Sequence, residues 1–210
     1  MVLHQKTAKI RCPGVVLFLL ILFLLSMVLP TKTSYASDIW DGTKITPVIP
    51  AGPDEQGAYY YFVTNGAELA WIAHQVNSGS NDFKDCFINI TKDIDLGEHE
   101  WTPIGTGTVE YEFETSRDIS GERTVNYYKP VLKNIKAFFG TFSGNGHLIK
   151  GLKINKPSAE TPQGLFGVLG YCAQIMSFKV QGDVSGKCYV GSAAGYIDKG
   201  AVYNIVSDVT

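Results

Sequence analysis

The sequence predicts an all-β fold, a parallel β-helix (solenoid) of 24–27-residue coils with an N-terminal capping α-helix. The main observation is a repeat near the C-terminus. The stretch "IKGLKI" (149–154) matches "IMSFKV" (175–180) at an offset of 26 residues, and "VYNIVS" (202–207) follows at an offset of 27. Repeats of roughly 20–50 residues are typical of stacked architectures, because one unit cannot bury its apolar face alone.

The repeat also predicts which side chains stack. Strands of neighbouring coils lie about 4.8 Å apart, so equivalent apolar residues should form columns through the solenoid. We expect one column of Ile149, Ile175 and Val202, and a second of Leu152, Phe178 and Ile205. A β-sandwich with glycine turns is the alternative, but a sandwich does not require successive strands to match at one fixed spacing.

Glycines recur in step with these strands, which is the second observation. Phe139-Gly140 recurs as Phe166-Gly167 and as Val190-Gly191, and Gly170-Tyr171 recurs as Gly195-Tyr196. We expect these glycines at the corners of the coils, where φ values that a Cβ disfavours are needed. The expected structural motif residues are Gly140, Gly164, Leu165, Phe166, Gly167, Gly170, Gly191 and Gly195.

Residues 1–36 have the pattern of a secretory signal peptide. A basic start without acids precedes the apolar run 15–29, and small residues precede a cleavage site between Ala36 and Ser37. An uncleaved membrane anchor is the alternative, but a span needs about 18 or more apolar residues, and Pro30 ends this run early. We therefore expect a secreted, extracellular or cell-surface protein that meets the membrane only transiently, through the signal peptide.

The net charge of the exported part of the chain limits the classes of partner that it can bind. Four of the 18 basic residues and none of the 20 acidic residues lie in 1–36, so residues 37–210 carry a net charge of −6. An acidic exported chain is poorly suited to hold nucleic acid or an anionic membrane surface. The expected partner is an extracellular glycan or protein.

The chain before the repeat divides into three segments, which are residues 37–64, 65–105 and 106–136. We expect residues 37–64 to form an irregular N-terminal segment with a short strand at 58–63. Residues 65–105 hold the capping helix and the first strands. The helix covers 66–78, with Asn65 or Thr64 as N-cap and Gly79 after its end. Its apolar stripe consists of Leu69, Ile72, Ala73 and Val76, which leaves His74 on the surface.

Strict alternation over 85–97 then predicts a half-buried strand or strand pair. The inward residues should be Cys86, Ile88, Ile90, Ile94 and Leu96. Trp101 and Ile104 predict a further packed turn.

Residues 106–136 are polar and charged, and they predict a hairpin inserted into the solenoid. The residues alternate around 109–113 and 125–128, and a turn signal lies near "DISGE". Tyr111, Tyr127 and Tyr128 are the residues that we expect to contact a ligand. The alternative is that these tyrosines only pack the hairpin together.

Cysteine and histidine residues indicate no metal or cofactor site. Cys86, Cys172 and Cys188 remain after signal cleavage, and the odd number allows at most one disulfide. Their spacings match no zinc pattern, and the histidines are scattered. A polysaccharide-cleaving enzyme needs paired carboxylates. One acidic cluster could supply them, Asp93 and Asp95 with Glu98 and Glu100. A solvated outer face is the alternative reading of that cluster.

The sequence resembles bacterial cell-surface proteins that carry the GLUG motif, seen here as "GLFG" at 164–167. Accompanying motifs are "WDG" (40–42), "AELAWIAHQVNSG" (67–79), "TKDIDLG" (91–97), "WTPIG" (101–105) and "GTFSGNGHLIKGL" (140–152). The resemblance implies a secreted or wall-attached β-solenoid of an adhesin-like protein. It extends to N-terminal regions of IgA-specific metallopeptidases, but this chain lacks the HExxH motif of that zinc chemistry.

These observations lead to a first hypothesis, a non-enzymatic surface module that binds an extracellular glycan or protein. The alternatives are a polysaccharide-acting β-helix enzyme and a structural accessory region of a larger secreted protein. Residues 137–210 end in mid-pattern without a cap, so we expect coils that continue in a longer polypeptide, or else a partner that covers the open edge.

Overall fold

The computed structural model describes residues 38–117, 120–121 and 123–210. It confirms the predicted parallel β-solenoid, which has about five turns. The elements are β1 (Tyr59–Val63), α2 (Gly66–Ser78), β2 (Cys86–Ile90), β3 (Ile94–Asp95), β4 (Thr106–Arg117), β5 (Thr124–Lys136), β6 (Thr141–Ser143), β7 (Leu148–Lys156), β8 (Phe166–Leu169), β9 (Gln174–Gly186), β10 (Ala194–Ile197) and β11 (Ala201–Val209). The predicted signal peptide and its cleavage site at Ala36–Ser37 lie outside the described residues.

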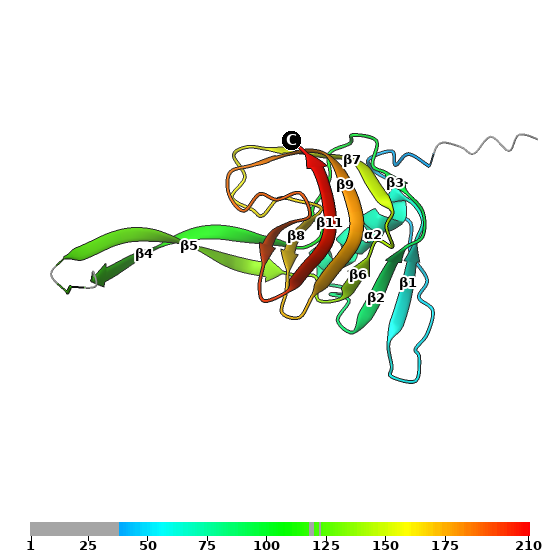
Figure 1. Ribbon diagram of the computed structural model, residues 1–210, viewed down its shortest axis with the longest axis horizontal. Coiled ribbons are helices and arrows are strands. Elements are labelled where there is room, and N and C mark those ends of the chain that lie inside the picture. Colours follow the sequence, from blue (N-terminus) through cyan, green and yellow to red (C-terminus); the bar gives the residue numbers. More distant parts are fainter. Residues whose placement is uncertain (1–37, 118–119, 122) are drawn as a thin grey trace, which may run out of the picture. The chain divides into compact units, whose positions relative to one another are not determined.

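The main sheet stacks one strand from each turn. β1, β2, β6 and β9 pair in that order, all parallel, and β11 pairs with β9 (Figure 1). The first half of β9 pairs with β6 and its second half with β7, which in turn pairs with β3. β8 and β10 form a second parallel sheet. This all-parallel pairing of the solenoid excludes the β-sandwich alternative.

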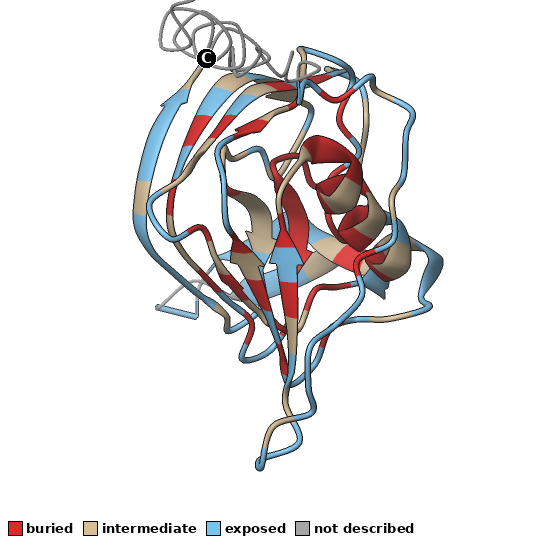
Figure 2. Cartoon of the chain, turned by 90° about the vertical axis from the view of Figure 1, so that its right-hand side faces the viewer, coloured by how far each residue is buried: buried red, intermediate tan, exposed pale blue. Residues whose placement is uncertain are grey.

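The core fills the space between the sheets and α2 (Figure 2). Aromatic rings make a continuous contact through it: Phe142 lies 5.1 Å from Phe166 and 5.5 Å from Phe178, measured between ring centroids. The predicted alternation over 85–97 is confirmed, since its inward residues are buried. These are Cys86, Ile88, Ile90, Ile94 and Leu96. Trp101 and Ile104 are buried as expected.

The predicted helix is confirmed as α2, with the predicted caps. The Asn65 side chain accepts a hydrogen bond from the Glu68 N–H, and Gly79 ends the helix in the left-handed conformation. Its predicted apolar stripe is buried in the core, and His74 is exposed. At the end of the helix, Asn77 donates to the Pro103 carbonyl (2.9 Å) and accepts from the Gly105 N–H (2.9 Å). The capping role of α2 stays a prediction, which these bonds support.

The pairing of β9 with β11 confirms one of the two contacts in each predicted column. Val202 pairs with Ile175, and Ile205 with Phe178. The other half is wrong, because Phe142 rather than Ile149 pairs with Ile175, and Ile149 pairs with Val180.

The second column fails in the same way, since Leu152 pairs with Gly182. The reason is the length of this turn. Phe142 and Ile175 are 33 positions apart, against 27 for Ile175 and Val202, because the loop 157–163 adds residues between β7 and β8. The offset of 26 therefore matched two strands that do not stack at that spacing.

The corners of the coils are built differently from the prediction. Of the six motif glycines, only Gly164 has a positive φ. Phe166-Gly167 stacks on Ala194-Gly195 and not on Phe139-Gly140. Gly167 is needed for close packing, because a Cβ there would collide with the Gly105 carbonyl oxygen. Left-handed backbone occurs instead at other glycines, such as Gly105 and Gly146, and at non-glycine residues, among them Asn145, Ser177 and Asn204.

Candidate functional site

The predicted inserted hairpin is present as a two-stranded antiparallel ribbon of β4 and β5, which we call the arm. It projects from the solenoid (Figure 1). Among the described residues of the arm, those at its base are buried against the body: Val109 and Leu132 pack with Val168 of β8. The Val109 N–H also donates to the Glu160 carbonyl at 2.7 Å. The arm therefore holds its outer residues away from the core.

One face of the arm is aromatic. Paired residues in an antiparallel ribbon lie on the same face, and faces alternate along each strand. Tyr111 is paired with Pro130, and Phe113 with Tyr128, so these four side chains share a face. Tyr111, Phe113 and Tyr128 are 46%, 59% and 69% exposed. The Phe113 and Tyr128 rings meet edge to face, with centroids 5.7 Å apart.

The opposite face is charged. Lys133 binds Glu112 at 2.6 Å, Lys129 binds Glu114 at 3.2 Å, and the Tyr127 hydroxyl donates to Glu114 at 2.7 Å. The Tyr127 hydroxyl and the Lys129 ammonium hold the pKa of Glu114 below its ordinary value. These exposed pairs fix side-chain positions more than they stabilise the fold.

The three tyrosines predicted as ligand contacts therefore do not form one surface. Tyr111 and Tyr128 share the aromatic face, whereas Tyr127 lies on the charged face. Sequence reasoning missed Phe113. It lies two residues after Tyr111 in the same strand, so the alternation that predicted the hairpin already placed both on one face.

Most carboxylates of the acidic cluster of residues 93–100 bind groups of the neighbouring turn. Asp93 accepts from the Leu148 N–H at 3.0 Å and lies 3.1 Å from the His147 ring nitrogen. Asp95 pairs with Lys150 at 3.0 Å. Glu100 accepts from the Asn155 N–H at 3.2 Å. These three carboxylates connect one turn to the next, and only Glu98 of the four lacks such a contact within the described residues.

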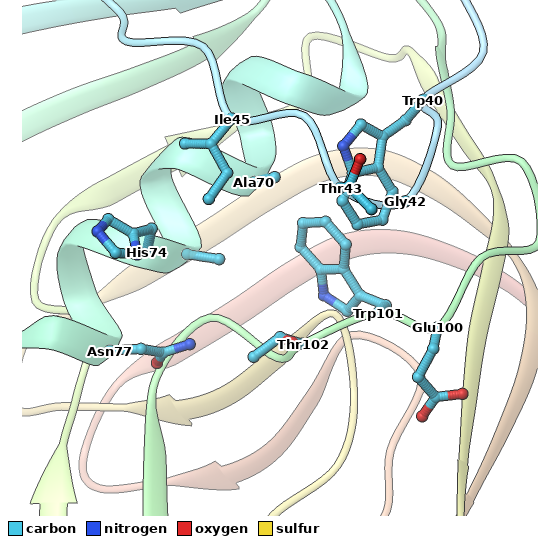
Figure 3. Close-up of a pocket in the computed structure, with 11 residues that line it drawn as sticks. Trp40, Gly42, Thr43, Ile45, Ala70, His74, Asn77, Glu100, Trp101 and Thr102 are labelled. Carbon is cyan, nitrogen blue, oxygen red and sulfur yellow. The ribbon is translucent and has the colours of Figure 1, made fainter.

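A pocket of about 220 Å³ lies between residues 40–45, α2 and residues 100–102 (Figure 3). The Trp40 and Trp101 indoles meet in it with centroids 5.5 Å apart, and the Glu100 carboxylate points away from them. Three motif segments of the sequence, 40–42, 67–79 and 101–105, converge here. The two indoles are only 7% and 1% exposed. They offer a ligand little ring surface, so the pocket chiefly joins the N-terminal segment to the helix.

The three cysteines in the described residues, Cys86, Cys172 and Cys188, are unbonded. Within the same residues, no three His, Cys, Asp or Glu side chains converge as metal ligands would. The described part of the chain also contains no helix of the length and hydropathy needed to cross a membrane.

Comparison with known proteins gives no relative: no protein-family model, curated protein or solved structure matches the chain.

Proposed function

We propose that the chain is a secreted, cell-surface, non-enzymatic module that binds an extracellular protein through the aromatic face of its arm. The observation that carries this proposal is the strip of Tyr111, Phe113 and Tyr128, whose side chains are 46–69% exposed on one face of the arm. Tyrosine and other aromatic side chains are enriched in protein interfaces and dominate their binding energy. An extracellular location follows from the signal-peptide pattern of residues 1–36.

The arm is better suited to bind a partner through its aromatic face than to pair with an added strand of that partner. Its strand edges carry charged residues, including Glu110, Glu112 and Lys129, and β5 contains Pro130, which has no N–H to donate. Such features discourage another strand from pairing with the edge. The aromatic face has no such protection, and the ion pairs on the other face hold the ribbon's side chains in place.

The engaged carboxylates support a non-enzymatic role. A glycoside hydrolase needs two carboxyl groups free to act on a sugar bond. Asp93, Asp95 and Glu100 each bind a group of the next turn instead. The structural accessory role predicts no partner for the arm, so binding experiments separate it from the proposed function.

The test is a binding measurement with a panel of purified extracellular matrix proteins. For a protein that binds, the triple variant Tyr111→Ala/Phe113→Ala/Tyr128→Ala should lose about tenfold or more in affinity. The matched control, Tyr127→Ala, removes a tyrosine from the other face of the same arm and should change affinity by less than about threefold.

Two outcomes would contradict the proposal. One is equal loss in the triple variant and the control. The other is an arm occupied by a second copy of the chain, seen as a dimer in light scattering that the triple variant converts to a monomer.

A further inference from the structure

A groove of about 690 Å³ crosses three turns of the solenoid, and none of the described residues that line it belongs to the arm. It runs over residues 82–87, 139–141 and 171–174, which belong to three successive turns. Sites for small molecules are commonly of this volume, with aromatic walls and a few placed polar groups. We call it the trans-coil groove.

Its floor is a row of outward-facing residues in register. Phe87 of β2 pairs with Thr141 of β6, which pairs with Gln174 of β9. On the near side, Tyr60 of β1 stacks on Phe87 with rings 5.1 Å apart and 11° from parallel. Because neighbouring strands are about 4.8 Å apart, the row presents one side chain per turn along a straight line.

The wall of the groove is also aromatic. Tyr171 is 61% exposed, and Lys199 lies 6.0 Å from its ring centre. Phe139 is half-buried beside it, and Phe87 on the floor is 37% exposed. The groove therefore offers the faces or edges of three aromatic rings to a bound molecule.

Several side-chain hydrogen-bonding groups in the groove have no partner within the described chain. The side chains of Lys84, Asp85 and Thr141 make no hydrogen bond or ion pair. The Gln174 Oε1 accepts from the Tyr203 hydroxyl at 2.9 Å, which leaves its Nε2 free to donate. A cation, a carboxylate, a hydroxyl and an amide are thus open to a ligand, so donors and acceptors are both present.

We infer that the trans-coil groove binds a neutral oligosaccharide laid along the solenoid axis. A sugar ring has an apolar face of C–H groups and hydroxyls around its edge. The first matches the aromatic rings, and the second matches the mixed donors and acceptors. Asp82 and Asp85 balance Lys84 and the nearby Lys199, and the chain has a net charge of −2, so nothing in the groove favours a polyanionic saccharide. This site is separate from the arm and does not depend on the arm's function.

The experiment titrates the purified full chain with tetrasaccharides and follows binding by calorimetry and NMR. The probes are a β-linked glucose tetramer, an N-acetylglucosamine tetramer and a galacturonic acid tetramer. At least one neutral probe should bind, and the Phe87→Ala/Tyr171→Ala variant should weaken it about tenfold or more. Neither side chain belongs to the buried core, but the variant loses the stacking of Phe87 on Tyr60, so its unfolding temperature should fall by only a few degrees.

The matched control is Tyr128→Ala, an aromatic change on the arm, which should leave saccharide affinity within about twofold. Three results would overturn the inference. No neutral probe binds at millimolar concentration; the galacturonic acid tetramer binds best; or the arm variant weakens binding as much as the groove variant. Loss of protein binding by the arm variant alone would bear only on the proposed function.

Discussion

Single residues at the corners of the coils adopt a conformation that most side chains avoid. Asn145, Ser177 and Asn204 have φ values of 50°, 57° and 56°. Their side chains bind across turns: Asn204 donates to the Ser177 hydroxyl at 3.0 Å, and Asn145 donates to the Ile90 carbonyl at 3.0 Å. Asparagine tolerates left-handed backbone better than other residues with a Cβ. The corners thus gain a cross-turn bond that glycine could not supply.

A pair of substitutions at Asn145 separates backbone from side chain. Asn145→Gly loses the bond to the Ile90 carbonyl and the bond accepted from the Ser143 hydroxyl. Asn145→Ala loses the same two bonds and also places an alanine in left-handed backbone. We expect Asn145→Ala to be less stable than Asn145→Gly by roughly 1–2 kcal/mol. Urea denaturation measures the difference, and equal stabilities would show that the corner relaxes.

Asp93 should make stability depend on acid pH. The Leu148 N–H, and then His147, hold the pKa of Asp93 below its ordinary value of 3.8. A lowered pKa means that the carboxylate stabilises the fold at pH above the unfolded value, and that this contribution is lost as pH falls through the folded value. Asp93→Ala should therefore melt at a lower temperature than the original chain near neutral pH. The gap should narrow as the pH falls below 3.8, and a gap that stays constant over that range would assign the effect to something other than the charge.

At the scale of elements, the C-terminal end of α2 is joined to residues 103–105 by the side chain of Asn77. Asn77 makes both of its hydrogen bonds to residues 103–105. Asn77→Ala should cost about 1–3 kcal/mol, because two backbone groups lose their partners. His74→Ala is the control, as that side chain is exposed. Hydrogen exchange should speed up at Gly105 only in the first variant, and unchanged exchange there would count against a capping role for α2.

The arm should be removable without unfolding the body. It packs on the solenoid through Val109 and Leu132, near its base. Replacing residues 112–129 with Asn-Gly, a favoured two-residue hairpin turn, keeps that contact. The melting temperature should fall by only a few degrees, and protein binding should disappear. A collapse of the main sheet, seen by circular dichroism, would mean that the arm stabilises the solenoid.

Across the whole molecule, the columns should lose stability toward β11. Ile175 is fully buried between Phe142 and Val202, whereas Val202 is 38% exposed. Ile175→Ala should cost about 2–5 kcal/mol, and Val202→Ala about 1 kcal/mol or less. Denaturation of both variants measures this gradient. Equal costs would indicate that the last strand is as well packed as the centre.

The sequence predicted the solenoid, α2 and the hairpin because each has a local pattern. The register between β6, β7 and β9 could not be predicted, since β6 has only three residues and the following turn is lengthened by a loop. The same limit hid the trans-coil groove. Phe87, Thr141 and Gln174 become neighbours only when that register is known. Tyr127 was grouped with Tyr111 because the strand pairing that separates them depends on the partner strand.

The row on the outside of the main sheet has a consequence for how such a chain can change. Backbone hydrogen bonds set the distance between successive positions, and the buried side chains set the fold, so neither depends on the outward residues. Thr141 and Gln174 can therefore be exchanged one at a time with little effect on the rest. Binding of a new molecule can therefore evolve on this surface by independent substitutions, while the backbone keeps the spacing between the binding positions constant.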